Sequence, residues 1–180
     1  MVTNNSINYL PGFIPLNQQV ASTSAALNFT NGITSAYNNY FLLISALVVS
    51  ATTTIQVQIS TNGGSSYIAT GYLCGNNTAL YSSTSFVNTT TTTGIFLSSS
   101  PGSSGIYFNY GVNLNNLTSG AGIVAAFATG NRAAGNLTTT DMDLSVGVYS
   151  TAATTVNAIR IIPASGTLTS GSATLFGVLK

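Results

Sequence analysis

The chain alternates apolar and polar residues in short runs, and glycine and asparagine residues separate these runs. Alternation with a period of two is typical of strands that bury one face, whereas no stretch sustains the 3.6-residue period of an amphipathic helix. Thr, Val, Ile, Tyr and Phe, which fit a pleated surface, recur in the runs. About nine or ten short strands with turn residues between them predict an all-β protein, a single antiparallel β-sandwich of jelly-roll-like topology.

The clearest strand covers Thr54–Ser60, where three aliphatic residues alternate with two glutamines and a serine. We expect the aliphatic face to lie in the core and the polar face to lie in water. The pair Asn62-Gly63 follows, and this pair favours the positive φ angles of a tight turn. The sequence therefore predicts a hairpin in which Ser65–Leu73 returns antiparallel to Thr54–Ser60.

Two other segments predict long strands. Tyr37–Val49 is apolar on both faces, which indicates a central strand covered by its own sandwich and by another layer or subunit. Ile106–Leu114 alternates, with its apolar residues at even positions. Thr89–Thr93 and Ser98–Ser104 are expected to be loops, although the threonine run also suits an edge strand. The remaining strands are expected at Ala79–Val87, Gly94–Leu97, Gly122–Ala128, Asp143–Tyr149, Thr155–Ile162 and Ala173–Leu179.

The N-terminal segment, residues 1–26, shows neither the two-residue period of a strand nor the 3.6-residue period of a helix. Proline fixes its own φ angle and biases the residue before it toward extended geometry. We therefore expect an extended docking arm over residues 1–26, followed by the β-sandwich domain over residues 27–180. The arm would bind a neighbouring subunit or cover its own sandwich. Its candidate assembly residues are Tyr9, Leu10, Pro11, Phe13, Ile14 and Pro15.

Charged residues are scarce: they make up 3% of the chain, with a net charge of +1 and no His. Acid-base catalysis and metal binding draw mainly on His, Glu, Asp, Lys and Cys. We therefore expect a non-enzymatic protein with no catalytic residues and no cofactor. Because little repulsion keeps the copies apart, we also expect a homo-oligomer.

The same composition bears on other partners. Three basic residues spread over the chain form no patch for phosphates, so we expect no nucleic-acid partner. The longest apolar run, Tyr40–Val49, is about half as long as a membrane span needs to be, so we expect no membrane insertion. The N-terminus has no basic start followed by an apolar stretch, so we expect no signal peptide.

Asp141 and Asp143 are the acidic residues of the chain. In a strand their spacing puts both carboxylates on one face about 7 Å apart. Calcium requires six or more oxygen ligands, so we favour an ion pair with Arg132 or Arg160 over a metal site. A partly buried pair would form an interface lock between subunits. The single cysteine, Cys74, ends an apolar stretch and is expected to be a small buried hydrophobic residue.

Three stretches carry a resemblance: Tyr37–Ser45, Ile59–Ser65 and Ser165–Gly177. They resemble the β-sandwich domains of bacteriophage tail and tail-fibre proteins, with Asn62 in place of the usual Asp and Phe176 in place of the usual Tyr. The resemblance covers roughly residues 37–180. It implies a non-enzymatic virion component, trimeric and exposed on the particle surface, with no catalytic residues to transfer.

Two other functions stay open. One is a capsid decoration protein, either a cement protein or a head fibre. The other is a cellular surface adhesin or extracellular filament subunit, against which the missing signal peptide argues. For binding to a host-surface glycan or protein, the candidate regions are the expected polar loops Thr89–Thr93, Ser98–Gly105 and Gly130–Gly135.

Overall fold

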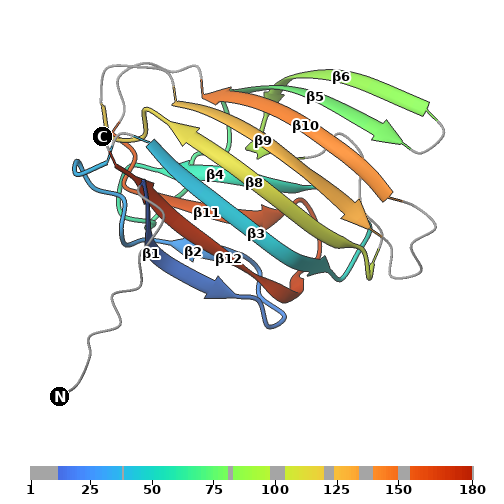
Figure 1. The fold of residues 1–180 in the computed structure, drawn as a ribbon, viewed down its shortest axis with the longest axis horizontal. Coiled ribbons are helices and arrows are strands. Elements are labelled where there is room, and N and C mark those ends of the chain that lie inside the picture. Colours follow the sequence, from blue (N-terminus) through green and yellow to red (C-terminus); the bar gives the residue numbers. More distant parts are fainter. Residues whose placement is uncertain are drawn as a thin grey trace.

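A computed structural model describes residues 12–37, 39–80, 83–97, 104–119, 124–133, 140–149 and 155–179. These residues form two antiparallel sheets that pack face to face (Figure 1). The expected all-β sandwich is therefore confirmed. No described segment is a helix that could cross a membrane. The strands are β1 (Phe13–Val20), β2 (Leu27–Phe29), β3 (Asn39–Val49), β4 (Ile55–Ser60), β5 (Tyr72–Leu80), β6 (Ser83–Thr92), β7 (Ile95–Phe96), β8 (Tyr107–Asn115), β9 (Val124–Ala133), β10 (Thr140–Tyr149), β11 (Ala158–Pro163) and β12 (Leu168–Val178).

Eight of these strands make a jelly roll. The large sheet has the order β1-β12-β3-β8-β9-β10-β5-β6, and the small sheet has the order β2-β11-β4-β7. When the two hairpins β5-β6 and β9-β10 are set aside, the pairs are β1 with β12, β2 with β11, β3 with β8 and β4 with β7. The first strand thus pairs with the last and the pairs nest inward, which is the connectivity of a jelly roll.

The two hairpins are insertions that widen only the large sheet. β5-β6 lies between β4 and β7 in the chain, and β9-β10 lies between β8 and β11. Both add to the large sheet beyond β8, so that β6 is the edge strand opposite β1 (Figure 1). β7, at the edge of the small sheet, contacts β10 and β5. The small sheet has half as many strands as the large one, so it covers only part of the inner face of the large sheet.

The core lies between the two sheets. In β8, Phe108, Tyr110, Val112 and Leu114 are at most 2% exposed, which confirms the alternation expected for this strand. Burial of such side chains stabilises the fold by about 25 cal/mol per Å² of apolar surface. The largest side chains in the core are Phe29, Tyr40, Leu42, Ile44, Leu47, Ile55, Ile59, Tyr72, Ile95, Leu97, Phe108 and Tyr110.

The expected boundary at residue 27 is wrong. β1 runs antiparallel to β12, from Phe13 opposite Val178 to Val20 opposite Ser172, so residues 13–20 belong to the sandwich. Pro15 is tolerated because β1 is an edge strand, where one row of backbone N–H groups has no partner strand. Of the two roles expected for the arm, residues 13–20 take the second: they pack on their own sandwich. The candidates Tyr9, Leu10 and Pro11 lie outside the described residues.

The expected hairpin after β4 is half right. Gly63 and Gly64 have φ angles of +71° and +86°, as a tight turn requires. The chain then makes a backbone hydrogen bond back to β4, from Ile68 N to Ile59 O at 2.9 Å. It continues into β5, which pairs with β10 and β6 in the other sheet. The turn is confirmed, but the antiparallel return over Ser65–Leu73 is wrong because this segment crosses between the sheets.

The polar face of β4 is not in water, contrary to expectation. Gln56 and Gln58 are 4% and 3% exposed. The Gln58 Nε2 group donates to the backbone oxygen of Thr93 at 2.6 Å, and the Thr93 hydroxyl donates to Gln56 Oε1 at 3.0 Å. The two amides are thus buried with hydrogen-bond partners from the segment between β6 and β7, as buried polar groups require.

Two other expected segments need correction. Ala79–Val87 is not one strand, because β5 ends at Leu80 and β6 begins at Ser83. Of the two alternatives for Thr89–Thr93, the edge strand is confirmed through Thr92 by the position of β6 in the sheet. Most of Ser98–Ser104 lies outside the described residues. Gly130 to Ala133 of the expected loop Gly130–Gly135 belong to β9.

Tyr72 gives the fold a testable pH dependence. Its buried hydroxyl donates to Ile68 O and accepts from Ile59 N, both at 3.0 Å. Burial raises the pKa of Tyr72 far above its ordinary value, although the hydrogen bond from Ile59 partly opposes this effect. Because the folded pKa exceeds the unfolded value of about 10, this stabilisation is complete below pH ~10 and is lost as the pH rises above it.

We therefore expect the free energy of unfolding of the wild type to fall above pH ~10. The substitution Tyr72→Phe should cost about 1–3 kcal/mol near neutral pH, because it leaves the Ile59 N–H without its acceptor. It should also make the alkaline decline shallower. Urea unfolding of both proteins between pH 6 and 11 measures these effects. An equally steep decline in the variant would contradict this role of Tyr72.

Candidate functional site

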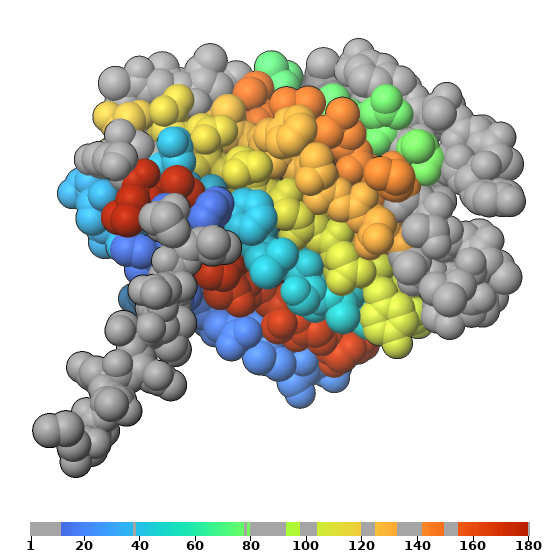
Figure 2. Space-filling model, viewed as in Figure 1, coloured from blue at the N-terminus to red at the C-terminus, as the bar shows by residue number. Residues whose placement is uncertain are grey.

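The outer face of the large sheet, which is turned away from the small sheet, is the most unusual surface of the molecule (Figure 2). Large apolar side chains on it are between 40% and 68% exposed. Soluble monomers commonly expose single apolar residues, but a contiguous group of them marks an interaction site. The seven residues that we call the apolar patch are Phe13, Leu43, Leu73, Phe127, Met142, Leu144 and Val146.

Strand register places these side chains on one face. Directly paired residues of neighbouring strands point to the same side of a sheet. Phe41 on β3 pairs with Phe176 on β12 and with Asn113 on β8. Asn113 pairs with Phe127 on β9, and Phe127 pairs with Val146 on β10. One continuous row across five strands is therefore apolar except at Asn113.

A second row lies beside the first. Leu43 on β3 pairs with Gly111 on β8, and Gly111 pairs with Thr129 on β9. Thr129 in turn pairs with Leu144 on β10. The two small residues stand between the two leucines, so the middle of this row is lower than its ends.

The part of the outer face nearest β1 is aromatic. Phe13 lies edge-on to Phe41, with ring centroids 5.4 Å apart and an interplanar angle of 78°, and edge-on to Phe176 at 6.4 Å. Edge-to-face pairs of this kind contribute about 0.5–1.5 kcal/mol beyond area burial. The three rings and Leu43 line a hollow of about 220 Å³. Phe13, a candidate of the arm, thus packs on its own chain.

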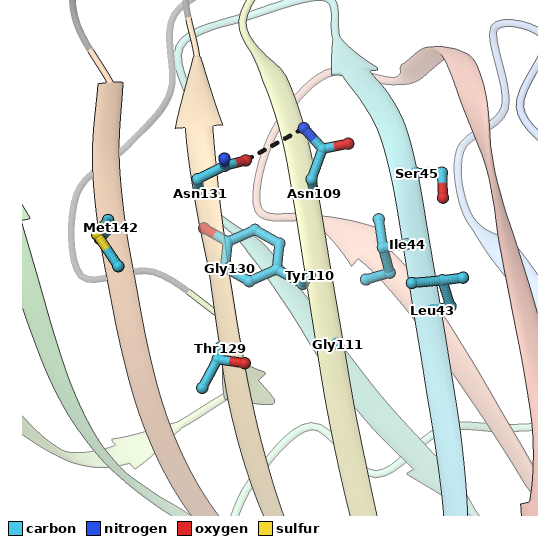
Figure 3. A pocket seen from close by; sticks show the side chains of 10 residues that line it. All are labelled: Leu43, Ile44, Ser45, Asn109, Tyr110, Gly111, Thr129, Gly130, Asn131 and Met142. Carbon is cyan, nitrogen blue, oxygen red and sulfur yellow. Dashed lines mark hydrogen bonds between the residues drawn. The ribbon is translucent and has the colours of Figure 1, made fainter.

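A broader depression lies over β8 and β9 (Figure 3). It has a volume of about 650 Å³ and extends from Leu43 to Met142, with Gly111 and Thr129 between them. Its lining is uncharged. It can hold an apolar or neutral hydrogen-bonding group.

Two asparagines that hydrogen-bond each other lie at one end of this depression. Asn109 Nδ2 donates to Asn131 Oδ1 at 3.2 Å, as the dashed line in Figure 3 shows. Asn109 Oδ1 accepts from the backbone N–H of Ala46 at 2.8 Å. Ala46 has a φ angle of +48° and lies where the register between β3 and β8 shifts. The Asn109 amide thereby supplies a partner for an N–H group at the bulge.

Arg132, Asp143 and Tyr110 meet on the opposite, inner face of the same strands. Arg132 Nε lies 3.1 Å from Asp143 Oδ2, and the Tyr110 hydroxyl donates to the same oxygen at 2.5 Å. Arg132 and Asp143 are 3% and 5% exposed. A Cβ at Gly130 would lie 2.3 Å from Tyr110 Cδ1, so glycine is what allows this ring to cross β9 (Figure 3).

The charged residues that the sequence singled out lie in different parts of the fold. Asp143 pairs with Arg132, one of the two expected partners, and both are fully buried in one chain, so the condition for a lock between subunits, a partly buried pair, is not met. Arg160 is elsewhere, with its Nε 2.7 Å from Gln58 Oε1 and its guanidinium 4.3 Å from the centre of the Tyr67 ring. The backbone of Asp141 pairs with Arg132 across β9 and β10, and its side chain lies outside the description.

Two other expectations concern reactive groups. Cys74 is buried at 5% exposure, as expected, and its Sγ lies 3.5 Å from the backbone oxygen of Gly94. The part of the chain that the structure describes contains no group of three or more His, Cys, Asp or Glu that could hold a metal ion. No charged side chain among those described lies on the outer face.

Sequence reasoning missed the apolar patch on β10. Met142, Leu144 and Val146 are 68%, 42% and 50% exposed, whereas Asp143 and Ser145 face inward. The polar residues that alternate with these apolar ones were the only signal, and this signal ordinarily indicates the opposite orientation.

The cause of this orientation is close packing under β10. A Cβ at Gly147 would lie 2.3 Å from Ile95 Cγ2. The Ser145 hydroxyl hydrogen-bonds Phe96 O and Asn76 Oδ1. Small and polar inward groups therefore let β7 approach β10, and the large apolar groups take the outer side.

Comparison with known proteins adds no family assignment: no family model, curated protein or solved structure matches this chain.

The ionic cluster predicts how substitutions change stability. Asp143→Asn breaks a buried ion pair and should lower the free energy of unfolding by about 3–5 kcal/mol. Tyr110→Phe keeps the pair and removes one hydrogen bond to a charged group, at a cost of about 1.5–3 kcal/mol. Urea unfolding measures both values. Because the cluster is internal, we expect folded Asp143→Asn protein to keep the oligomeric mass of the wild type, and a changed mass would argue against an internal role.

Proposed function

We propose that this protein is a non-enzymatic structural protein of a bacteriophage virion, exposed on the particle surface as a tail- or fibre-type component for assembly or host attachment. The observation that carries the structural role is the outer face of the large sheet, where the side chains of the apolar patch are exposed and the described side chains bear no charge. Such a face is suited to contact with another protein.

The phage assignment rests on the sequence resemblance. The resembling stretches fall largely on two paired strands: Tyr37–Ser45 leads into and occupies the first part of β3, and Ser165–Gly177 leads into and fills most of β12. Ile59–Ser65 contains the end of β4 and the turn after it. Jelly rolls occur in viral capsid and lectin domains, which supports the proposal by analogy, although a fold by itself does not determine function.

The chemistry of the chain supports a role without catalysis. Asp143 and Arg132 contact each other in the core, and Cys74 is buried at 5% exposure. Arg160 is engaged by Gln58 and by the Tyr67 ring. In these positions the charged groups and the cysteine contribute to the stability of the sandwich. Among the described residues, the surface that remains for partners consists of apolar side chains, hydroxyls and amides, which suits assembly contacts and neutral ligands.

A capsid decoration protein is the second candidate. A broad sheet face can lie flat on a shell of other subunits, and the outer face extends over the strands from β1 to β5. The two candidates share their chemistry and differ in their position on the particle. A direct image of that position separates them.

The test is immunogold electron microscopy, with antibody raised against the recombinant protein, on particles and cells from the source culture. We expect gold on phage tails or fibres. Gold spread over heads would assign the decoration role, and gold confined to cell envelopes or filaments would overturn the phage proposal. The control is the same antibody saturated with recombinant protein, which should abolish the label.

A further inference from the structure

We propose that the outer face of the large sheet packs against the same face of a second copy of this chain, about a two-fold axis. This inference rests on the proposed function, because a component that assembles must bury the surfaces through which it assembles. It goes further by naming both the surface and the partner. The contact is centred on β8, β9 and β10, with Phe127 and Met142 as its main projecting groups.

The exposed area is what a pair of copies needs. At roughly 150–250 Å² for a whole large side chain, the exposed fractions in the apolar patch give on the order of 600 Å² of apolar surface. A standard interface buries about 800 Å² on each partner, and about 65% of a homodimer interface is apolar, which corresponds to roughly 500 Å². The patch therefore supplies the apolar part of one complete interface.

Charge favours a second copy over a different partner. A charged partner is recognised through complementary charge, but the described side chains of the outer face have none to offer. The chain as a whole has a net charge of +1. A second outer face is equally neutral and equally apolar, so it meets the first without desolvating a charge. Isologous contacts require self-complementarity of this kind.

The positions of the projecting and recessed residues on the outer face also fit a two-fold axis. Phe127 projects from β9 two residues before Thr129, which lines the depression, so the two positions are about 7 Å apart along the strand. An axis that lies in the interface and bisects this separation places each Phe127 over the depression of the other copy. The axis is then perpendicular to β9, and the two large sheets pack aligned and about 10 Å apart.

This arrangement closes with two copies. Each outer face is used once and completely, which leaves no equivalent face for a third copy. The inference therefore replaces the trimer implied by the sequence resemblance with a two-fold pair as the unit of assembly.

The test is sedimentation equilibrium of the full chain and three lysine variants. Met142→Lys places a charge at the most exposed residue of the patch, which is 68% exposed, so the fold should tolerate it. Phe127→Lys removes the group that enters the depression. Asn28→Lys is the matched control: Asn28 is exposed on β2 of the small sheet, between the buried Leu27 and Phe29, so it faces away from the large sheet.

We expect twice the chain mass for the wild type and for Asn28→Lys. Met142→Lys and Phe127→Lys should weaken pairing by ~100-fold or more, because the axis brings uncompensated like charges into one dry interface. Circular dichroism and the melting temperature at high dilution should show that Met142→Lys remains folded.

Three results would overturn the inference: a wild type with the mass of one chain at every concentration, a trimer, or a pair that Met142→Lys leaves intact. These results are independent of the immunogold experiment. Gold on phage particles together with a single-chain mass would reject this interface and retain the proposed function. A two-fold pair that is absent from phage particles would do the reverse.

Discussion

The unequal width of the two sheets is the constraint on which the rest of the structure depends. The jelly roll supplies four strands to each sheet, and two inserted hairpins then extend the large sheet to eight. The small sheet packs only on the inner face, and its edge strand β7 ends the coverage at β10 and β5. The large sheet therefore has three environments: a covered inner region, an inner region at the margin of the small sheet, and an outer face that the small sheet does not touch.

The margin explains the polar groups in the core. An apolar core needs closely packed partners on both sides, and the edge of the small sheet supplies fewer of them. Beside β7 the Ser145 hydroxyl donates to Asn76 Oδ1, whereas Asn76 Nδ2 is buried without a hydrogen-bond partner. Elsewhere on β10, Asp143 contacts Arg132 and Tyr110. Hydrogen-bonded polar groups fill such a region at lower cost than an empty cavity does. The same strands carry their large apolar side chains on the outer side, so the polar core and the apolar surface have a common origin in the inserted hairpins.

Sequence patterns predicted the elements that are governed by local chemistry. The alternation of β8 was correct because the apolar residues on one side of this strand lie in the core between the two sheets. The Asn62-Gly63 turn was correct because positive φ angles are a local requirement. The orientation of β10 depends on β7, which packs beneath it, and the burial of Gln58 depends on Thr93, which hydrogen-bonds its amide. Neither partner can be recognised from the residues of β10 or β4 alone. The crossing at Ile68 and the pairing of β1 with β12 are also long-range choices, so the expected hairpin and the expected boundary of the arm were wrong.

In the proposed pair, neutral apolar surface holds the two copies of this chain together, with no contribution from charge. The mass of the wild type by sedimentation equilibrium, from about 0.01 M to about 1 M salt, tests this claim most directly, because the Debye length falls from about 30 Å to about 3 Å over that range. The account predicts twice the chain mass at both extremes. A mass that falls to one chain at high salt would contradict it, because only an assembly that depends on charge dissociates when charges are screened.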